Sequence, residues 1–305
     1  MTHDQYDEFA MLAENAAEAG VSGPLPSGAR VSCTLADGTL LSAIKWGDDP
    51  QIVLLHGGGQ NAHTWDTVVV TLGVSALAVD LPGHGHSDWR VDHDYWPVRS
   101  ADAVAHAIET HAPNAAGVVG MSLGGLTTIR LAAVHPELVR RAVVIDVTPS
   151  VFERQLAMSR AQRGTTALVS GPRVYDTVED MIAATAASAP HRTASSIRRG
   201  VLHNAKALAD GKWAWRYDDL DPEGAGPPDF SALWRDVSAA TAPIALVVGG
   251  DSVFVAEADR DEFLRRRPDA VVVAIAGAGH SVQSDQPVAL ARFLRSFVFA
   301  APVVE

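Results

Sequence analysis

The chain has 305 residues, of which 24 are lysine or arginine and 36 are aspartate or glutamate, and 47% of its residues are apolar. This is the composition of a globular protein with a sizeable core, and a formal charge of -12 with no basic run interleaved with aromatic residues argues against a nucleic-acid partner and against an anionic membrane surface. The single cysteine, Cys33, excludes an intramolecular disulfide and a metal site built from cysteines, so we expect a cytoplasmic protein.

Residues 1–29 are expected to form an N-terminal extension. Residues 4–19 have the polar, alanine-containing pattern of a helix, and several glycines and prolines follow them. Because this start is acidic and has no apolar centre, it does not have the pattern of a signal peptide. No charge-free apolar run reaches about 18 residues, the length that a membrane-spanning helix needs.

Short apolar runs alternate with helical patterns after residue 30. Residues 31–35 and 40–46 flank a turn at Asp37-Gly38, which predicts a β-hairpin and therefore an antiparallel edge. Four largely apolar runs indicate strands buried on both faces; they lie at residues 51–55, 74–79, 116–119 and 141–145. Helical patterns lie between them at residues 62–72, 98–111 and 123–134. The alternation predicts an α/β fold with a mostly parallel sheet.

The pattern changes between residues 150 and 240. This segment has helical patterns at 178–187 and 194–209 and no long apolar run. An alternation of Trp213, Trp215 and Tyr217 is interpreted as internal packing. Strand and helix patterns resume at residues 244–248, 256–267, 270–276 and 288–299. We therefore predict one α/β domain formed by residues 30–149 and 241–305, with residues 150–240 inserted as a helical cap.

The most informative motif is GMSLGG at residues 120–125, between a predicted strand and a predicted helix. In this context G-x-S-x-G places its serine on a sharp turn, with the hydroxyl exposed at the end of the sheet. Ser122 is therefore the predicted nucleophile. The helix that starts after it directs unpaired amides, including that of Leu123, toward negative charge that develops there.

A serine hydroxyl needs a base to become a good nucleophile. Among the twelve histidines we favour His280, because it lies in the glycine-rich AGAGHS at residues 276–281, after the last predicted strand and at the same end of the sheet as Ser122. Seven other histidines are interpreted as surface or packing residues; they are His63, His93, His106, His111, His135, His191 and His203.

A second glycine-rich motif, HGGGQ at residues 56–60, directly follows the first buried strand. Such a run lets a backbone amide turn toward the serine, so the amides of Gly58 and Leu123 are the predicted oxyanion hole. His56 is interpreted as a support of this loop. We place His56, Gly57 and Met121 in the predicted substrate pocket.

These motifs resemble those of the α/β-hydrolase superfamily, in its capped subgroup. The matching segments are LLHGGGQNAHTW, AVDLPGHGHS, VVGMSLGG and AGAGHS, in the superfamily's order. The resemblance covers residues 30–149 and 243–299 and implies an α/β-hydrolase fold, with helices on both faces of the sheet and no metal or organic cofactor. It also implies that His84, His86 and Asp88 belong to a turn rather than to a metal site.

The acid of the triad is open between two aspartates. The superfamily usually has it after the strand that follows the cap, in G-x-x-D, but GGDS at residues 249–252 has Ser252 there and Asp251 one residue early. Some capped serine hydrolases resemble a second arrangement, with the acid at the strand end where Asp146 lies. We favour Asp146, because the strand ends of an open parallel sheet converge on one crevice, and expect Ser252 to hydrogen-bond His280.

The sequence thus predicts a serine hydrolase that cleaves a small carboxylic ester, lactone, thioester or amide through an acyl-enzyme. Three alternatives share the fold. A carbon–carbon bond hydrolase of aromatic degradation uses the same triad. It ranks below the esterase, in second place, because that family usually has an asparagine where this chain has Met121. The others are a cofactor-free perhydrolase and a ligand-binding receptor without turnover. The expected partner is a small-molecule substrate, and the sequence makes no prediction of the oligomeric state.

Overall fold

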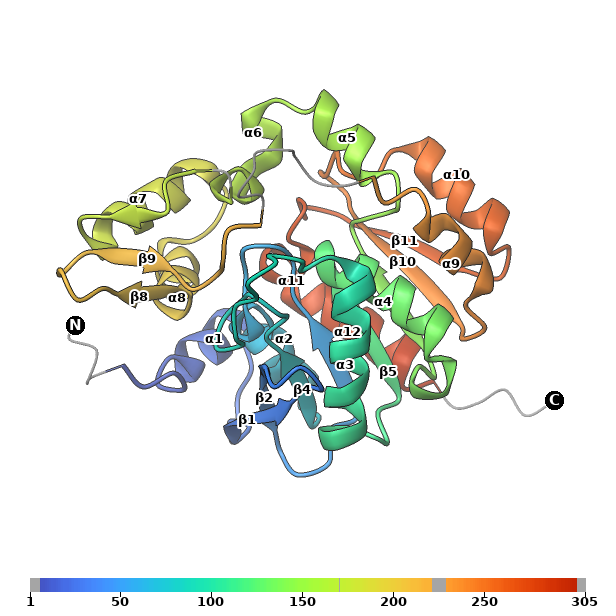
Figure 1. Ribbon diagram of the computed structural model, residues 1–305, viewed down its shortest axis with the longest axis horizontal. Helices are drawn as coiled ribbons and strands as arrows, with labels where there is room; N and C mark the ends of the chain where they lie inside the picture. The colour runs from blue at the N-terminus through green and yellow to red at the C-terminus, as the bar shows by residue number, and fades with distance from the viewer. Residues whose placement is uncertain (1–5, 170, 221–228, 301–305) are drawn as a thin grey trace.

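An eight-stranded sheet runs through the centre of the molecule in the computed structural model, which describes residues 6–169, 171–220 and 229–300 (Figure 1). Its strands are β1 (Gly28–Thr34), β2 (Leu40–Trp46), β3 (Ile52–Leu55), β4 (Ala76–Val79), β5 (Gly117–Met121), β6 (Ala142–Ile145), β10 (Ile244–Gly249) and β11 (Val271–Ile275). Their spatial order is β1-β2-β4-β3-β5-β6-β10-β11. The pairs β1/β2 and β2/β4 are antiparallel and the others are parallel, as the hairpin and the buried runs predict.

The helices of the structure and their bounds are as follows. The α-helices are α1 (Leu12–Ala19), α2 (Asp66–Leu72), α3 (Pro97–His111), α4 (Leu123–Val134), α5 (Val151–Ala157), α6 (Arg160–Arg163), α7 (Val178–Ser188), α8 (Ala194–Asn204), α9 (Leu233–Ala239), α10 (Glu257–Arg266), α11 (Val282–Asp285) and α12 (Pro287–Val298). The 3₁₀ helices are η2 (Ala62–Trp65), η3 (Pro136–Leu138) and η4 (Gly164–Leu168). Within the described residues, no helix is both long enough and apolar enough to cross a membrane.

Two apolar layers hold helices on both faces of the sheet. Along β3, Val53 and Leu55 join the core that contains residues of α3, α4 and α9, whereas Ile52 and Leu54 join the core with α2 and α12. Successive side chains of a strand point to opposite faces, so a strand covered on both sides must be apolar at every position. All residues of β3, β4, β5, β6 and β10 are buried accordingly.

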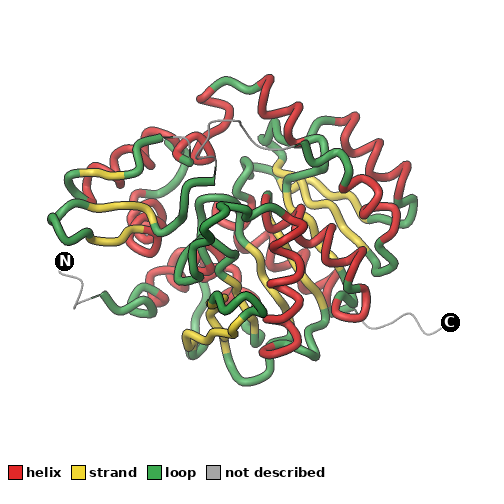
Figure 2. Tube along the Cα trace, in the orientation of Figure 1, coloured by secondary structure: helices red, strands yellow, loops and turns green. Residues whose placement is uncertain are grey.

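The inserted segment differs from the predicted helical cap. It contains helices α5 to α8, and also a three-stranded sheet in the order β7-β9-β8, formed by β7 (Val174–Tyr175), β8 (Ala205–Ala207) and β9 (Trp213–Trp215). Figure 2 shows these short strands beside the red helices of this segment. The helix predicted at 194–209 ends at Asn204, because the chain enters β8 and pairs with β9. Trp215 and Tyr217 stack in this cap core.

The N-terminal segment packs against both the sheet domain and the cap. Its helix begins at Leu12 rather than near residue 4. The ring of Phe9 meets Trp46 of β2 edge to face, with centroids 5.5 Å apart. Glu18 of α1 forms an ion pair with Arg199 of the cap helix α8. This segment therefore connects the cap to the sheet domain.

Candidate active site

Ser122 lies on a strained turn between the end of β5 and the start of α4. Its φ of 51° and ψ of −116° are unusual for a residue with a side chain. Close packing of the two elements demands glycine nearby, because a Cβ atom at Gly120 would lie 2.0 Å from the carbonyl oxygen of Gly124. The amide of Ser122 donates to the carbonyl of Ile145 on β6 (3.0 Å), which fixes the turn to the neighbouring strand.

Asp146 directly follows β6 and lies next to His280. Nδ1 of His280 donates to Oδ2 of Asp146 over 2.8 Å, and the amide of Gly249 donates to the other carboxylate oxygen over 2.9 Å. Asp146 is fully buried and, like Ser122, has a φ of 51°. The three strand ends meet at one place, as the convergence of parallel strands predicts.

Asp251 and Ser252, which the sequence predicts as the alternative acid or as a helper, have different environments in the structure. Asp251 is exposed, and its amide donates to the carbonyl of Ala278 (2.9 Å). Ser252 donates its hydroxyl to Oδ2 of Asp146, so the expected bond from Ser252 to His280 is corrected. The carboxylate and not the imidazole is the partner, because Nδ1 of His280 already donates to the same oxygen.

Nε2 of His280 is available to act as a base. Since a carboxylate only accepts, Nδ1 carries the proton and Nε2 keeps its lone pair. Nε2 is buried and makes no hydrogen bond with any described residue. The ring stacks on Phe254 with a centroid distance of 3.6 Å and an angle of 15°. Sequence reasoning missed Phe254, although it lies two residues after Ser252.

The loop after β3 presents one free amide near Ser122. The amide of Gly57 donates to Oε1 of Gln60 (3.1 Å), and that of Gly59 donates to Nε2 of His84 (3.1 Å). Within the described part of the chain, the amides of Gly58 and Leu123 make no hydrogen bond. These are the two amides predicted for the oxyanion hole, and both remain available to a ligand.

His56 and His84 support this loop through hydrogen bonds. The prediction that His56 lines the substrate pocket is wrong, because His56 is fully buried and is not among the residues that line the cavity. His56 is fully buried, where its Nδ1 donates to the carbonyl of Gly57 (2.8 Å) and its Nε2 accepts from the amide of Leu81 (2.9 Å). Burial lowers the pKa of His56, and it lowers that of His84 to about 3. Both rings are therefore neutral, so each can donate with one nitrogen and accept with the other.

A cavity of about 470 Å³ connects these groups with the cap. Ser122, His280 and Met121 line it together with Gly57 and Gly58. The cap contributes a mixture of polar and apolar side chains to the lining; these include Thr165, Thr166, Leu168, Val169, Trp215 and Tyr217. The pocket predicted around the nucleophile thus has the size of a small-molecule site.

The cap is joined directly to the glycine loop. Nδ2 of Asn204, at the end of α8, donates to the carbonyl of Gly59 over 2.7 Å. Nδ2 of Asn61 donates to the carbonyl of His203 over 3.0 Å. The C-terminal end of α8 is therefore fixed against the loop that carries Gly58, a relationship with no local signal in the sequence.

The sheet order, the strained serine after β5 and the pair formed by His280 and Asp146 are the features of an α/β hydrolase. Residues 52–293 match the alpha/beta hydrolase family, and the chain belongs to that family. The chain is 52% identical over 291 residues to the esterase Rv0045c of Mycobacterium tuberculosis, and the alignment covers 95% of each chain.

Solved structures and a second relative extend this similarity. A structure of the esterase Rv0045c from work on its inhibition by transition metals matches with a TM-score of 0.86 and 50% identity, covering 97% of this chain and 100% of that chain. The 2-(acetamidomethylene)succinate hydrolase of Mesorhizobium japonicum is 28% identical over 264 residues, covering 85% of this chain and 92% of the other. The protein is therefore an α/β-fold hydrolase.

Proposed function

We propose that the protein is a serine esterase that hydrolyses a small carboxylic ester through an acyl-enzyme. The observation that carries this proposal is the hydrogen bond between His280 and Asp146, which leaves Nε2 of His280 free in the cavity that Ser122 also lines. The similarity to an esterase over 95% of the chain favours an ester over the other substrates that such a triad cleaves.

In the proposed reaction Oγ of Ser122 attacks the ester carbonyl while Nε2 of His280 takes the hydroxyl proton. Asp146 keeps the imidazole oriented and stabilises its positive charge. The amides of Gly58 and Leu123 donate to the oxyanion of the tetrahedral intermediate. His280 then gives its proton to the leaving alkoxide, and the alcohol departs. Attack by water, with the same base, releases the acid and restores Ser122.

The cavity favours a small and partly polar substrate. Its volume of about 470 Å³ fits a molecule of modest size. The threonines of η4, Thr165 and Thr166, line the cavity together with the apolar side chains of Leu168 and Val169. We therefore expect a short acyl chain with at least one polar group rather than a long unsubstituted one.

A serine-directed probe tests the proposal. Wild-type protein is incubated with a fluorophosphonate, and a panel of p-nitrophenyl esters of increasing acyl length is then hydrolysed by the same samples. We expect labelling and turnover of short esters, and loss of both in Ser122→Ala. The matched control is Ser296→Ala, because this exposed serine only donates to the carbonyl of Phe293.

Two results would overturn the proposal of a serine esterase. A wild-type protein that neither reacts with the probe nor turns over any ester would identify a fold used for ligand binding without catalysis. Equal labelling of Ser122→Ala and the wild type would place the reactive serine elsewhere.

A further inference from the structure

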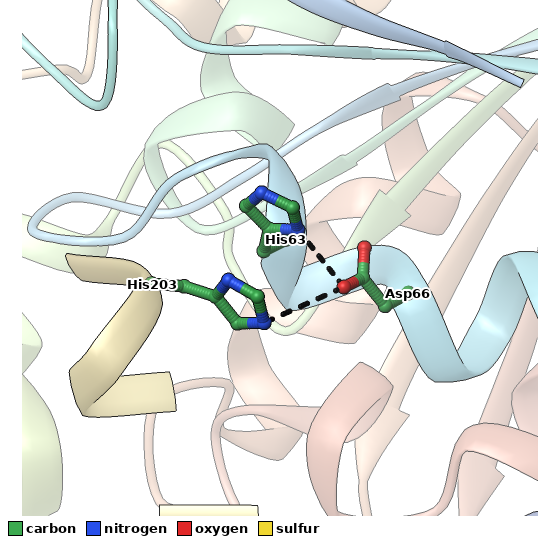
Figure 3. Close-up of side chains that lie close together, drawn as sticks. All are labelled: His63, Asp66 and His203. Atoms are coloured by element: carbon green, nitrogen blue, oxygen red, sulfur yellow. Dashed lines mark hydrogen bonds and ion pairs between the residues drawn. The ribbon is translucent and has the colours of Figure 1, made fainter. Parts of the chain in front are cut away.

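Three buried side chains beside the cavity form a group that ester hydrolysis does not use. His63 lies in η2, Asp66 begins α2, and His203 is the penultimate residue of the cap helix α8 (Figure 3). One ligand atom of each, a ring nitrogen or a carboxylate oxygen, lies within 4.8 Å of the others. The residues are 8%, 2% and 4% exposed, respectively. The sequence predicts only surface or packing roles for His63 and His203 and makes no prediction for Asp66.

The contacts inside the group are incomplete. Nδ1 of His63 lies 2.9 Å from Oδ2 of Asp66, whereas Nε2 of His203 lies 3.7 Å from the same oxygen, too far for a hydrogen bond. Nε2 of His203 and Oδ1 of Asp66 are buried and make no hydrogen bond within the described part of the chain. Buried polar atoms without a partner are costly, so a ligand that satisfies them is favoured.

The second ring nitrogen of each histidine, the one not next to Asp66, has a polar partner, as in metal sites. Nε2 of His63 lies 3.1 Å from Oε2 of Glu8, and Nδ1 of His203 lies 2.5 Å from the hydroxyl of Tyr6. Histidine ligands typically donate their second N–H to a carboxylate or another oxygen, which fixes the tautomer and directs the other lone pair at the metal. Here both outer partners come from the N-terminal segment.

We propose that His63, Asp66 and His203 bind one divalent transition-metal ion, with two imidazole nitrogens and a carboxylate oxygen as ligands. This donor set suits Zn²⁺, Ni²⁺ and Cu²⁺ and leaves a position for water. A metal-binding nitrogen must offer its lone pair, so Nδ1 of His63 releases the proton that it now shares with Asp66. The cavity provides the path of entry, because His63 and His203 both line it.

Binding requires one ring to turn. The imidazoles of His63 and His203 are stacked, with centroids 3.8 Å apart and planes inclined by 10°. The lone pairs of parallel rings do not converge on one point, so the His203 ring rotates toward Asp66 when the ion binds. The ion then links α8 of the cap to η2 and α2 of the sheet domain.

The test is titration of the metal-free protein with Co²⁺ and with Zn²⁺. The visible absorption of Co²⁺ reports a site with nitrogen and oxygen ligands, and Zn²⁺ is followed by calorimetry and by the shift in Tm. We expect one equivalent of each ion to bind to the wild type and Zn²⁺ to raise its Tm. His203→Gln and His63→Gln keep a side chain of similar size, and each should weaken binding at least tenfold and abolish the shift in Tm.

Two controls separate this site from other histidines. His191→Gln should bind both ions as the wild type does, because His191 lines the same cavity but lies next to Asp285 (3.2 Å). His280→Gln should also bind them normally, which distinguishes this site from the triad. Circular dichroism confirms folding, and Asp66→Asn is a third variant if a histidine variant fails to fold. Wild-type protein that binds neither ion, or unchanged binding by His203→Gln, would overturn the proposal, and neither readout requires ester turnover.

Discussion

Ser252 donates its hydroxyl to Oδ2 of Asp146, the oxygen that also accepts from Nδ1 of His280. The hydroxyl is itself positioned, because Oγ of Ser252 accepts from the amide of Phe254 over 3.2 Å. The residue at the superfamily's usual acid position therefore contacts Asp146, the proposed acid, at the end of another strand. A serine there supports a carboxylate, whereas a second carboxylate would repel it.

We expect Ser252→Ala to lower kcat about 10-fold to 100-fold, since a hydrogen bond to a charged group contributes about 1.5–3 kcal/mol. KM should change little, because Ser252 is not among the residues that line the cavity. Steady-state kinetics on a short p-nitrophenyl ester measure both constants. A raised KM with an unchanged kcat would show that Ser252 acts on substrate binding instead.

Substitution of the two candidate acids, Asp146 and Asp251, should affect kcat very differently. Asp146→Asn should lower kcat by about 10⁴-fold, because an amide in place of the carboxylate no longer selects the tautomer with a free Nε2 on His280. Asp251→Asn should be close to the wild type, since Asp251 is exposed. The two variants are compared in the same ester assay after a check of their unfolding midpoints. Near-normal activity of Asp146→Asn would contradict the triad proposed here.

The strands and the nucleophile turn could be predicted because their signals are local. A run such as residues 52–55 is apolar at every position because β3 is covered on both faces, and GMSLGG carries the turn chemistry around Ser122 in six residues. The choice between Asp146 and Asp251 rested on the convergence of strand ends, which is a weaker argument. The hydrogen bonds of Asp146 support the first choice.

Other features depend on contacts between distant segments and have no local signal. His63 and His203 are 140 positions apart and stack only because α8 packs against η2. The strands β8 and β9 are three residues each, too short for an alternating pattern to distinguish them from a helix end. The cap was therefore predicted as helical, although a small sheet forms part of it.

The link between Asn204 and Gly59 predicts that the cap controls the oxyanion loop. Asn204→Asp keeps the shape and can still accept from Nδ2 of Asn61, which now donates to Oδ1 of Asn204 over 3.3 Å. It loses the donor to the carbonyl of Gly59 and places a carboxylate oxygen against it. We expect a loss of about 1 kcal/mol of stability and about a 10-fold lower kcat/KM, because the loop that carries Gly58 is no longer fixed.

Urea unfolding and ester kinetics check this prediction on the same preparation. The matched control is Asn114→Asp, an exposed asparagine in the loop before β5. If Asn204→Asp unfolds like the wild type and keeps its kcat/KM, the cap does not position the loop.

The buried carboxylate of Asp80 should make the free energy of unfolding depend on pH. Its carboxylate is fully buried and accepts from Nη1 of Arg30 (2.5 Å) and from the amides of Ala62 (2.7 Å) and His86 (3.0 Å). Burial alone would raise the pKa of Asp80, but the charge of Arg30 and the amide donors outweigh it and hold the pKa below its usual value.

A carboxyl group whose folded pKa is lowered stabilises the native state above its unfolded pKa, about 3.9, and loses this contribution as the pH falls through the folded value. Asp80→Asn removes the charge and should cost about 3 kcal/mol at neutral pH, the lower end for a broken buried pair, because Arg30 keeps its ion pair with Glu8. Urea unfolding from neutral pH down through pH 4 should show the difference from the wild type shrinking below about pH 4. The exposed Asp251→Asn serves as control. A difference that grows as the pH falls would mean that Asp80 is protonated in the native state, and the assignment of a buried charged pair with Arg30 would be wrong.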